Sequence, residues 1–392
     1  MRKVMILLSA LMVFAMVLSA CAAPAAAPAP AAEAPAADAA ATEAPAAEAP
    51  AADAAACTPG EGSIAVLLPD SASSARWEND DRRYFEEAFT AAGVEFSIVN
   101  AEGDAAAQQT QAEQALTNGA KVILLVNLDS GSGAAIIAKA KEAGARVIDY
   151  DRLTIDTDNA ASVYVSFDNV AVGRAMGDTL EPLINALGKT PARVVQLNGS
   201  PTDNNATLFR EGYFSVAEPH YTDGSWELVA DQAVPQWDNQ QALTIFQQIL
   251  TDAGNDVDAV FAANDGLANS VISALKTAGL EPMPVSGQDA TVAGMQNVLS
   301  GWQSMSVYKP IKAEAEAAAA AAIALHNCED ASALAEGNVL NNGKVDVPFI
   351  KLTPIAVTKD NIKETVIADG FRTWEELCVG DFEQYCPPAD QR

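Results

Sequence analysis

The apolar residues of this chain follow two alternating spacings from Ser63 onward. Short runs rich in Val, Ile and Leu, typical of buried strands, are separated by segments of helical spacing that end near glycine. The first five strands are predicted at Ile64–Leu68, Val94–Val99, Val122–Val126, Arg146–Tyr150 and Val163–Ser166. Helices are predicted between them around Arg82–Ala92, Gln108–Asn118 and Ala134–Ala143. Continuous apolar strands joined through helices predict a parallel sheet that is covered on both faces.

A second series of strand and helix patterns begins near residue 190. Its strands are predicted at Arg193–Leu197, Trp226–Val229, Asp258–Phe261 and Met283–Ser286, and each leads into a helical pattern. The 392 residues of the chain exceed what one core usually organises. The sequence therefore predicts an α/β fold of two lobes, each with a parallel sheet between layers of helices.

The first residues of the chain have the order of an export signal. Two basic residues precede the apolar run Val4–Leu18, and small residues then lead to Cys21. This order is typical of a secretory signal rather than of a membrane-spanning helix. The residues before Cys21 resemble a bacterial lipobox, which implies a signal peptide over 1–20 and a lipid on the Cys21 sulfur; an ordinary cleaved signal is the alternative. Residues 21–61 are rich in Ala and Pro and lack large apolar groups, so we expect a tether.

The composition argues against nucleic-acid and metal chemistry. Acidic residues number 52 against 23 basic ones, for a net charge of −29, whereas binding to phosphates needs clustered Lys and Arg. The two histidines, His220 and His326, lie far apart and lack the spacing of a metal site. We therefore expect an acidic, soluble protein with no metal, no other cofactor and no nucleic-acid partner.

Four cysteines remain after Cys21, and an even number in an exported chain suggests two disulfides with three possible pairings. Cys57 precedes the first strand, at the end away from its carboxyl edge, and Cys328 ends a helix that is expected to run away from the same edge. These positions favour a bond between Cys57 and Cys328, which leaves Cys378 and Cys386 to close a small loop. The other pairings stay open at this point.

Polar and aromatic side chains follow the carboxyl ends of predicted strands in both lobes. Ligands of open α/β sheets gather at that edge. Carboxylates accept hydrogen bonds, carboxamide, guanidinium and ammonium nitrogens donate them, and indole rings cover apolar faces, so the set suits a ligand with many hydroxyl groups. Any single Asn or Asp could instead cap a helix, and Trp77 could belong to the core. The candidates are Arg76, Trp77, Arg152, Asp203, Asn205, Trp237, Asn264, Asp289 and Lys309.

Several of these segments resemble motifs of bacterial periplasmic D-xylose-binding proteins. The motifs are Gly199–Ala206, Tyr150–Arg152, Ser286–Ala290, Val307–Ile311 and Leu340–Gly343, and the resemblance covers about Ser63 to Phe371. Carried over by matching positions, it implies the nine candidates as the ligand set and adds Asp70 and Asp265 as weaker ones. Ser73–Trp77 also resembles the related multi-sugar-binding proteins.

The resemblance implies a two-lobed type I periplasmic-binding-protein fold with a hinge of three strands. The N-terminal lobe is expected to take 62–166 and 308–345, and the C-terminal lobe 167–307 and 346–371. The segments Gln303–Val307 and Val347–Leu352 are expected to cross between the lobes, and Ser166–Asn169 to serve as hinge and helix cap. Residues 372–392 form an additional tail with two cysteines.

The function implied by the resemblance is that of a binding protein and not of an enzyme. We expect an extracytoplasmic solute-binding protein of an ATP-binding-cassette sugar importer, lipid-anchored at the outer face of the cytoplasmic membrane or in the periplasm. It would be a monomer that binds a monosaccharide, D-xylose first, and delivers it to the membrane permease and its ATPase. The alternatives are a binding protein for several aldoses such as glucose, galactose and arabinose, a sugar sensor, and an exported glycoside hydrolase.

Overall fold

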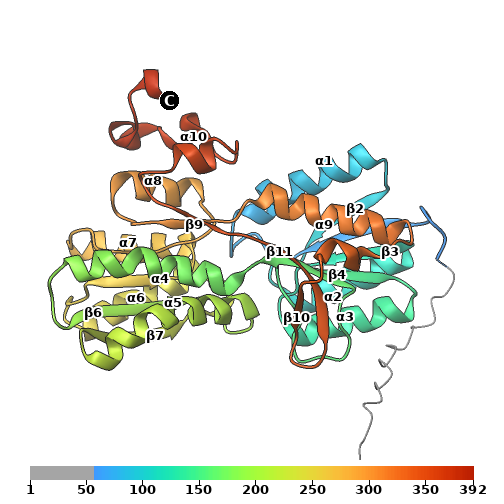
Figure 1. The fold of residues 1–392 in the computed structure, drawn as a ribbon, viewed down its shortest axis with the longest axis horizontal. Helices are drawn as coiled ribbons and strands as arrows, with labels where there is room; N and C mark the ends of the chain where they lie inside the picture. Colours follow the sequence, from blue (N-terminus) through green and yellow to red (C-terminus); the bar gives the residue numbers. More distant parts are fainter. Residues whose placement is uncertain (1–56) are drawn as a thin grey trace, which may run out of the picture. The chain divides into compact units, whose positions relative to one another are not determined.

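The structure is a computed structural model that describes residues 57–392 (Figure 1). The expected signal peptide, the lipidation at Cys21 and most of the tether lie outside the described residues. Within residues 57–392, no helix is long and apolar enough to cross a membrane.

The first lobe is built on a seven-stranded sheet in the order β10-β11-β5-β4-β3-β1-β2, in which all neighbours are parallel except β10 and β11. Its strands are β1 (Ser63–Leu68), β2 (Phe96–Asn100), β3 (Ala120–Leu125), β4 (Arg146–Tyr150), β5 (Val163–Phe167), β10 (Val339–Asn341) and β11 (Asp346–Leu352). Its main helices are α1 (Arg82–Ala92), α2 (Ala105–Thr117), α3 (Ser130–Glu142) and α9 (Ile311–His326).

Both faces of this first sheet are buried, because alternate residues of its strands belong to different cores. Along β1, Val66 packs in the core that contains α1 and α9, and Leu67 packs in the core that contains α2 and α3. A strand with two covered faces needs apolar residues at every position. This explains why β1 is a continuous apolar run and not an alternating one.

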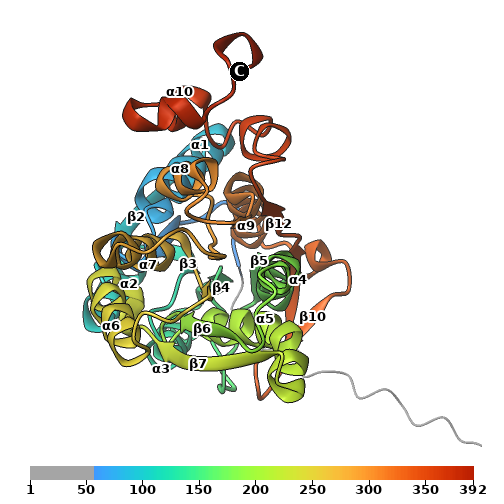
Figure 2. The ribbon, with the colours of Figure 1, turned by 90° about the vertical axis from the view of Figure 1, so that its left-hand side faces the viewer.

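The second lobe contains a three-stranded parallel sheet in the order β7-β6-β8. Figure 2 shows α4 on one side of β6, and α6 and α7 on the other. The short antiparallel pair β9–β12 is linked to this lobe through bridges at Val285 and Gln288. The elements are α4 (Asn169–Ala186), β6 (Ala192–Asn198), α5 (Asn204–Asp223), β7 (Trp226–Ala233), α6 (Asn239–Asp252), β8 (Ala259–Ala262), α7 (Asp265–Ala278), α8 (Val292–Ser300), β9 (Ser306–Tyr308) and β12 (Ile355–Val357).

The chain passes between the two lobes at three places. They are the links from β5 to α4, from β9 to α9 and from β11 to β12 (Figure 1). Asp168 caps α4 at the first link by accepting a hydrogen bond from the Ala171 amide at 3.0 Å. Such short links between two packed lobes have the arrangement of a hinge.

Two segments differ from the sequence prediction. Residues 346–352 were expected in the C-terminal lobe, but they form β11, which pairs with β5 in the first sheet. Met283–Ser286 was expected to be a strand, but it makes only one bridge, from Val285 to Val260. Pro284 has no amide hydrogen, so this segment cannot continue a regular ladder.

The tail packs on the second lobe through α8, and it includes the short helix α10 (Trp374–Leu377). The structure contains both disulfides that the sequence favoured. One joins Cys57 to Cys328, and the other joins Cys378 to Cys386 within the tail.

Candidate functional site

A narrow cavity lies between the two lobes, at the carboxyl ends of strands from both sheets. All nine principal candidates from the sequence line it, because β1, β4, β6 and β8 end at this edge. That they bind a ligand stays a prediction. The full lining is Ser73, Ser74, Arg76, Trp77, Asp151, Arg152, Asp203, Asn205, Phe209, Trp237, Asn264, Gln288, Asp289 and Lys309.

Two indole rings border the cavity, one from each lobe. The ring nitrogen of Trp77 donates to the Ser73 hydroxyl at 3.2 Å, and that of Trp237 donates to Asp203 Oδ2 at 3.1 Å. Both side chains are almost completely buried. Each polar edge already has a partner, and the Arg76 guanidinium lies over the Trp77 ring, 4.3 Å from its centre. A ligand would therefore meet only the parts of the apolar ring faces that stay uncovered.

Asp203 and Asn205 of the second lobe contact the first lobe. The Oδ2 atom of Asp203 lies 3.0 Å from Arg152 Nε, as an ion pair rather than an aligned hydrogen bond. The Asn205 side chain donates to Asp151 Oδ1 at 3.0 Å, and its oxygen accepts from Asn169 at 2.9 Å. Asn169, which we expected only in the hinge and cap, therefore also orients a residue that lines the cavity.

Asp151 lies at the centre of the site but was not among the candidates from the sequence. It accepts from Arg76 Nη1 at 2.9 Å and from Lys309 Nζ at 3.2 Å, and its backbone has a φ of 61°. Burial alone would raise the pKa of Asp151, but Lys309, Arg76 and Arg152 together hold it below its ordinary value. Asp151 is therefore a buried anion held by three cations.

We expected the guanidinium of Arg76 to donate hydrogen bonds to a ligand, but most of its donors are taken by buried carboxyls. Its Nε and Nη2 atoms donate to Asp81 at 2.8 and 2.7 Å, and Nη2 also donates to Glu314 on α9 at 2.7 Å. The buried carboxylate of Asp81 needs a counter-cation in the dry interior. Arg76 thus presents only Nη1 toward the cavity, where it holds Asp151, instead of a fork free for two ligand hydroxyls.

Glu314 itself lies behind the cavity and was not identified from the sequence. Burial raises its pKa to about 8, although Arg76 acts in the opposite direction. One of its oxygens, Oε1, has no hydrogen-bond partner within the described residues 57–392. A protonated carboxyl would explain how this group is tolerated beside Asp81 and Asp151.

Two further hydrogen bonds join the lobes beside the cavity. Ser74 donates its hydroxyl to Asp289 Oδ2 at 3.0 Å, and Asn264 donates to the Ser73 carbonyl at 3.3 Å. The oxygen of Asn264 also caps α7 through the Leu267 amide. Asn264 therefore caps a helix, which we considered as the alternative to ligand binding, and it also lines the cavity.

Four more residues of the lining were not among the sequence candidates: Ser73, Ser74, Phe209 and Gln288. Ser73, Ser74 and Gln288 stand inside motifs named in the sequence analysis, and Phe209 comes three residues after the motif Gly199–Ala206, so proximity to a candidate was the available signal. The side chain of Gln288 is buried, and its Oε1 has no partner within the part of the chain that the structure describes. A ligand hydroxyl could donate to that oxygen.

The two weaker candidates do not line this cavity. Asp70 accepts from the Ala72 amide at 2.8 Å and from the Ser73 hydroxyl at 2.9 Å, so it shapes the loop after β1. Asp265 accepts from Gln303 at 2.7 Å and from Ser306 at 2.8 Å, so it anchors the segment that leads into β9. Burial raises the pKa of Asp265 to about 6.

The charges of the side chains that line the cavity balance. Three cations, Arg76, Arg152 and Lys309, stand against three carboxylates, Asp151, Asp203 and Asp289, although Arg76 also pairs with Asp81 outside the lining. A charged ligand would disturb this balance in a buried site. The chemistry of the lining, with donors, acceptors and two indole faces, instead fits a small neutral ligand rich in hydroxyl groups.

A two-lobed α/β fold with three links and a polar cavity between the lobes defines a solute-binding protein of the type I class. The chain belongs to the periplasmic binding protein family, whose domain model matches residues 64–329. Its fold is therefore that of the family, and the cavity lies where the two lobes of such a protein meet.

Among curated proteins, the chain is similar to D-xylose-binding periplasmic proteins. It is 37% identical over 303 residues to that of Escherichia coli K12, and the match covers 77% of this chain and 88% of the relative. It is 38% identical over the same length to that of Haemophilus influenzae, with the same coverage.

Among solved structures, the chain resembles two solute-binding proteins with bound glucose. A carbohydrate-transporter protein from Chloroflexus aurantiacus in complex with D-glucose has a TM-score of 0.74 and 29% identity, over 80% of this chain and 97% of the other. A protein from Clostridium phytofermentans with bound β-D-glucose has a TM-score of 0.72 and 31% identity, over 80% and 99%.

Proposed function

We propose that this protein is the extracytoplasmic binding component of an ATP-binding-cassette sugar importer, with D-xylose as its ligand. The observation that carries the proposal is the buried cavity with balanced charges and two indole faces. The similarity to D-xylose-binding proteins over most of the chain supports the choice of sugar. The bound glucose in the two similar structures supports an aldose in general.

Binding would close the two lobes around the sugar. A ligand shifts such an equilibrium only by the difference in its affinity for the open and closed forms. Because the cavity is lined from both lobes, the full set of contacts exists only in the closed form. Asp203 and Asp289 would accept hydrogen bonds from sugar hydroxyls. Arg152, Asn264 and Lys309 would donate hydrogen bonds to the sugar, and the two Trp rings would cover its apolar faces. The closed form would then dock on the permease.

The protein would act as an exported, lipid-anchored monomer. Anchoring through Cys21 would keep it near the permease, with residues 21–61 as a spacer. Palmitate labelling of the expressed chain, compared with Cys21→Ser, tests the anchor. Incorporation of label into both forms equally would contradict it.

Calorimetry with D-xylose tests the residues of the site. Arg152→Ala and Asp289→Ala each remove one charge from the buried balance, so we expect a loss of about 2 kcal/mol or more, which is about 30-fold in affinity. Matched controls are Arg174→Ala and Asp178→Ala, since both side chains are exposed on α4. Unchanged affinity in both site variants would show that the assignment is wrong.

The choice of sugar is tested by thermal shift with a panel of pentoses and hexoses. A ligand that binds only the folded state raises its stability, so D-xylose should give the largest shift. Larger shifts with glucose, galactose or arabinose would favour the broader aldose-binding alternative.

We propose that the protein is not an enzyme. The three cavity carboxylates each have a cation within 4 Å. A general acid of a glycosidase needs instead a raised pKa beside the scissile bond. Incubation with xylosides and other glycosides should give stoichiometric binding without product, and measured turnover would contradict this proposal.

A further inference from the structure

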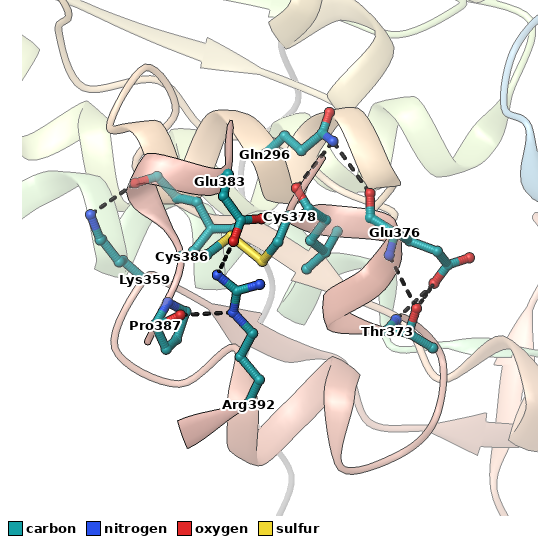
Figure 3. The surroundings of a disulfide bond; sticks show 11 residues. Gln296, Lys359, Thr373, Glu376, Cys378, Glu383, Cys386, Pro387 and Arg392 are labelled. Atoms are coloured by element: carbon teal, nitrogen blue, oxygen red, sulfur yellow. Dashed lines mark hydrogen bonds and ion pairs between the residues drawn. A yellow bond between two sulfur atoms is a disulfide. The ribbon is translucent and has the colours of Figure 1, made fainter. Parts of the chain in front are cut away.

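The C-terminal tail, residues 372–392, is a packed part of the second lobe. Gln296 on α8 donates to the carbonyls of Leu377 at 3.2 Å and Glu376 at 3.4 Å (Figure 3). Trp374 and Leu377 are buried in a core shared with α8. The bond between Cys378 and Cys386 closes the segment that follows α10. The start of the tail is therefore held in a fixed place.

That start places one guanidinium between the two lobes. Arg372 donates from Nε to the Ala290 carbonyl of the second lobe at 3.0 Å, and its Nη2 lies 3.5 Å from Asp80 Oδ2. Asp80 belongs to the π-helical turn Trp77–Asp81 of the first lobe. Arg372 thus contacts both lobes through side-chain atoms.

One partner of Arg372 is next to a residue of the sugar cavity, and the other is next to a residue that holds one. Ala290 follows Asp289, and Asp80 precedes Asp81, which holds Arg76. Asp80 is buried, so removal of its cation would leave a poorly hydrated carboxylate. Burial raises the pKa of Asp80, whereas Arg372 lowers it.

A second cavity shows that the pair lies at the boundary of the lobes. It is bordered by Asp80 and Arg83 from the first lobe, by Asn269 and Thr291 from the second, and by Arg372. Arg83 also lies 3.6 Å from Asp80, but its side chain is half exposed. Arg372, which is about 10% exposed, is the buried cation of the two.

We propose that Arg372 is a positioning residue that the tail contributes to the binding site, and that its pair with Asp80 forms on closure and slows opening. This inference rests on the proposed function, since it concerns the closed form around a sugar. An interaction made only in the closed state holds the ligand longer without speeding its arrival. The tail would thereby set the residence time of the sugar.

The test uses the full chain and D-xylose, with affinity from calorimetry and rates from stopped-flow tryptophan fluorescence. We expect Arg372→Gln and Asp80→Asn each to raise the dissociation rate about 3- to 10-fold and to change the association rate less than about twofold. The double variant should be no worse than either single variant, because both remove the same pair. Arg372→Lys should restore part of the effect.

The control is Arg392→Gln, whose guanidinium pairs with Glu383 inside the tail and should leave both rates unchanged. Melting without sugar checks the fold of every variant; if Arg372→Gln does not fold, Asp80→Asn decides, since it leaves the tail intact. Single variants with wild-type rates, or effects that add in the double variant, would overturn the inference. A wild-type chain that binds no aldose would instead overturn the proposed function.

Discussion

Gly199 shows how a single residue shapes the cavity. It follows β6, and a Cβ atom at this position would lie 2.0 Å from Cη2 of Trp237. The indole therefore packs directly on bare backbone while its nitrogen bonds to Asp203. No side chain larger than hydrogen fits between them, so the position of the ring depends on this glycine.

Gly199→Ala should displace Trp237 from the cavity. We expect weaker D-xylose binding in calorimetry and a loss of about 1 to 3 kcal/mol in the free energy of unfolding, because the added methyl overpacks the site. Gly131→Ala is the control, since Gly131 is exposed in the first turn of α3 and its Cβ would meet only one oxygen of Asp129, at 3.2 Å. Wild-type affinity in Gly199→Ala would contradict a role for this ring.

At the scale of elements, the two disulfides fix very different lengths of chain. The bond between Cys57 and Cys328 joins the residues before β1 to the end of α9 across a separation of 271 residues. The bond between Cys378 and Cys386 spans 8 residues. In the chain-entropy description, a cross-link stabilises mainly by restricting the unfolded state, and more so for a longer loop.

Replacing both Cys57 and Cys328 by Ser should therefore lower the free energy of unfolding by about 4 to 5 kcal/mol. The Cys378→Ser and Cys386→Ser pair should cost clearly less. Urea denaturation followed by circular dichroism at neutral pH measures both. Equal losses would show that strain or local packing, and not loop length, governs the two bonds.

At the scale of the whole molecule, buried carboxyls in different parts of the fold share one electrostatic effect. Burial raises the pKa of Asp149 to about 7, of Asp265 to about 6 and of Glu314 to about 8. Such groups keep their protons in the folded chain at a pH where the unfolded chain has lost them. Their contribution to the free energy of unfolding is fully present below the pKa that the group has in the unfolded chain. It is lost as the pH rises through the pKa that the group has in the folded chain.

The free energy of unfolding should therefore fall between about pH 4.5 and pH 8 through these groups. Glu314→Gln, which mimics the neutral carboxyl, should flatten the upper part of this slope, between pH 6 and 8. Urea denaturation at several pH values measures the slope. The exposed variant Glu364→Gln should keep the wild-type slope, and an unchanged slope in Glu314→Gln would contradict the role of that carboxyl.

Local patterns in the sequence are enough to predict the order of the elements and the edge of the sheets where the site lies. Apolar runs and helical spacing are local properties, and they predicted α1 and β4 with the bounds that the structure has. In a parallel sheet all strands end at one edge, so the residues that follow them gather there. This is why nine candidates chosen one strand at a time line one cavity.

The pairing of side chains and the place of some strands depend instead on how the chain folds in three dimensions. The fork of Arg76 bonds to Glu314, 238 residues later, and Asp151 is central because Lys309 reaches it across a hinge. The strand β11 completes the first sheet although its position in the chain suggested the second lobe. These outcomes depend on contacts between residues far apart in the chain and on burial, which no local pattern encodes.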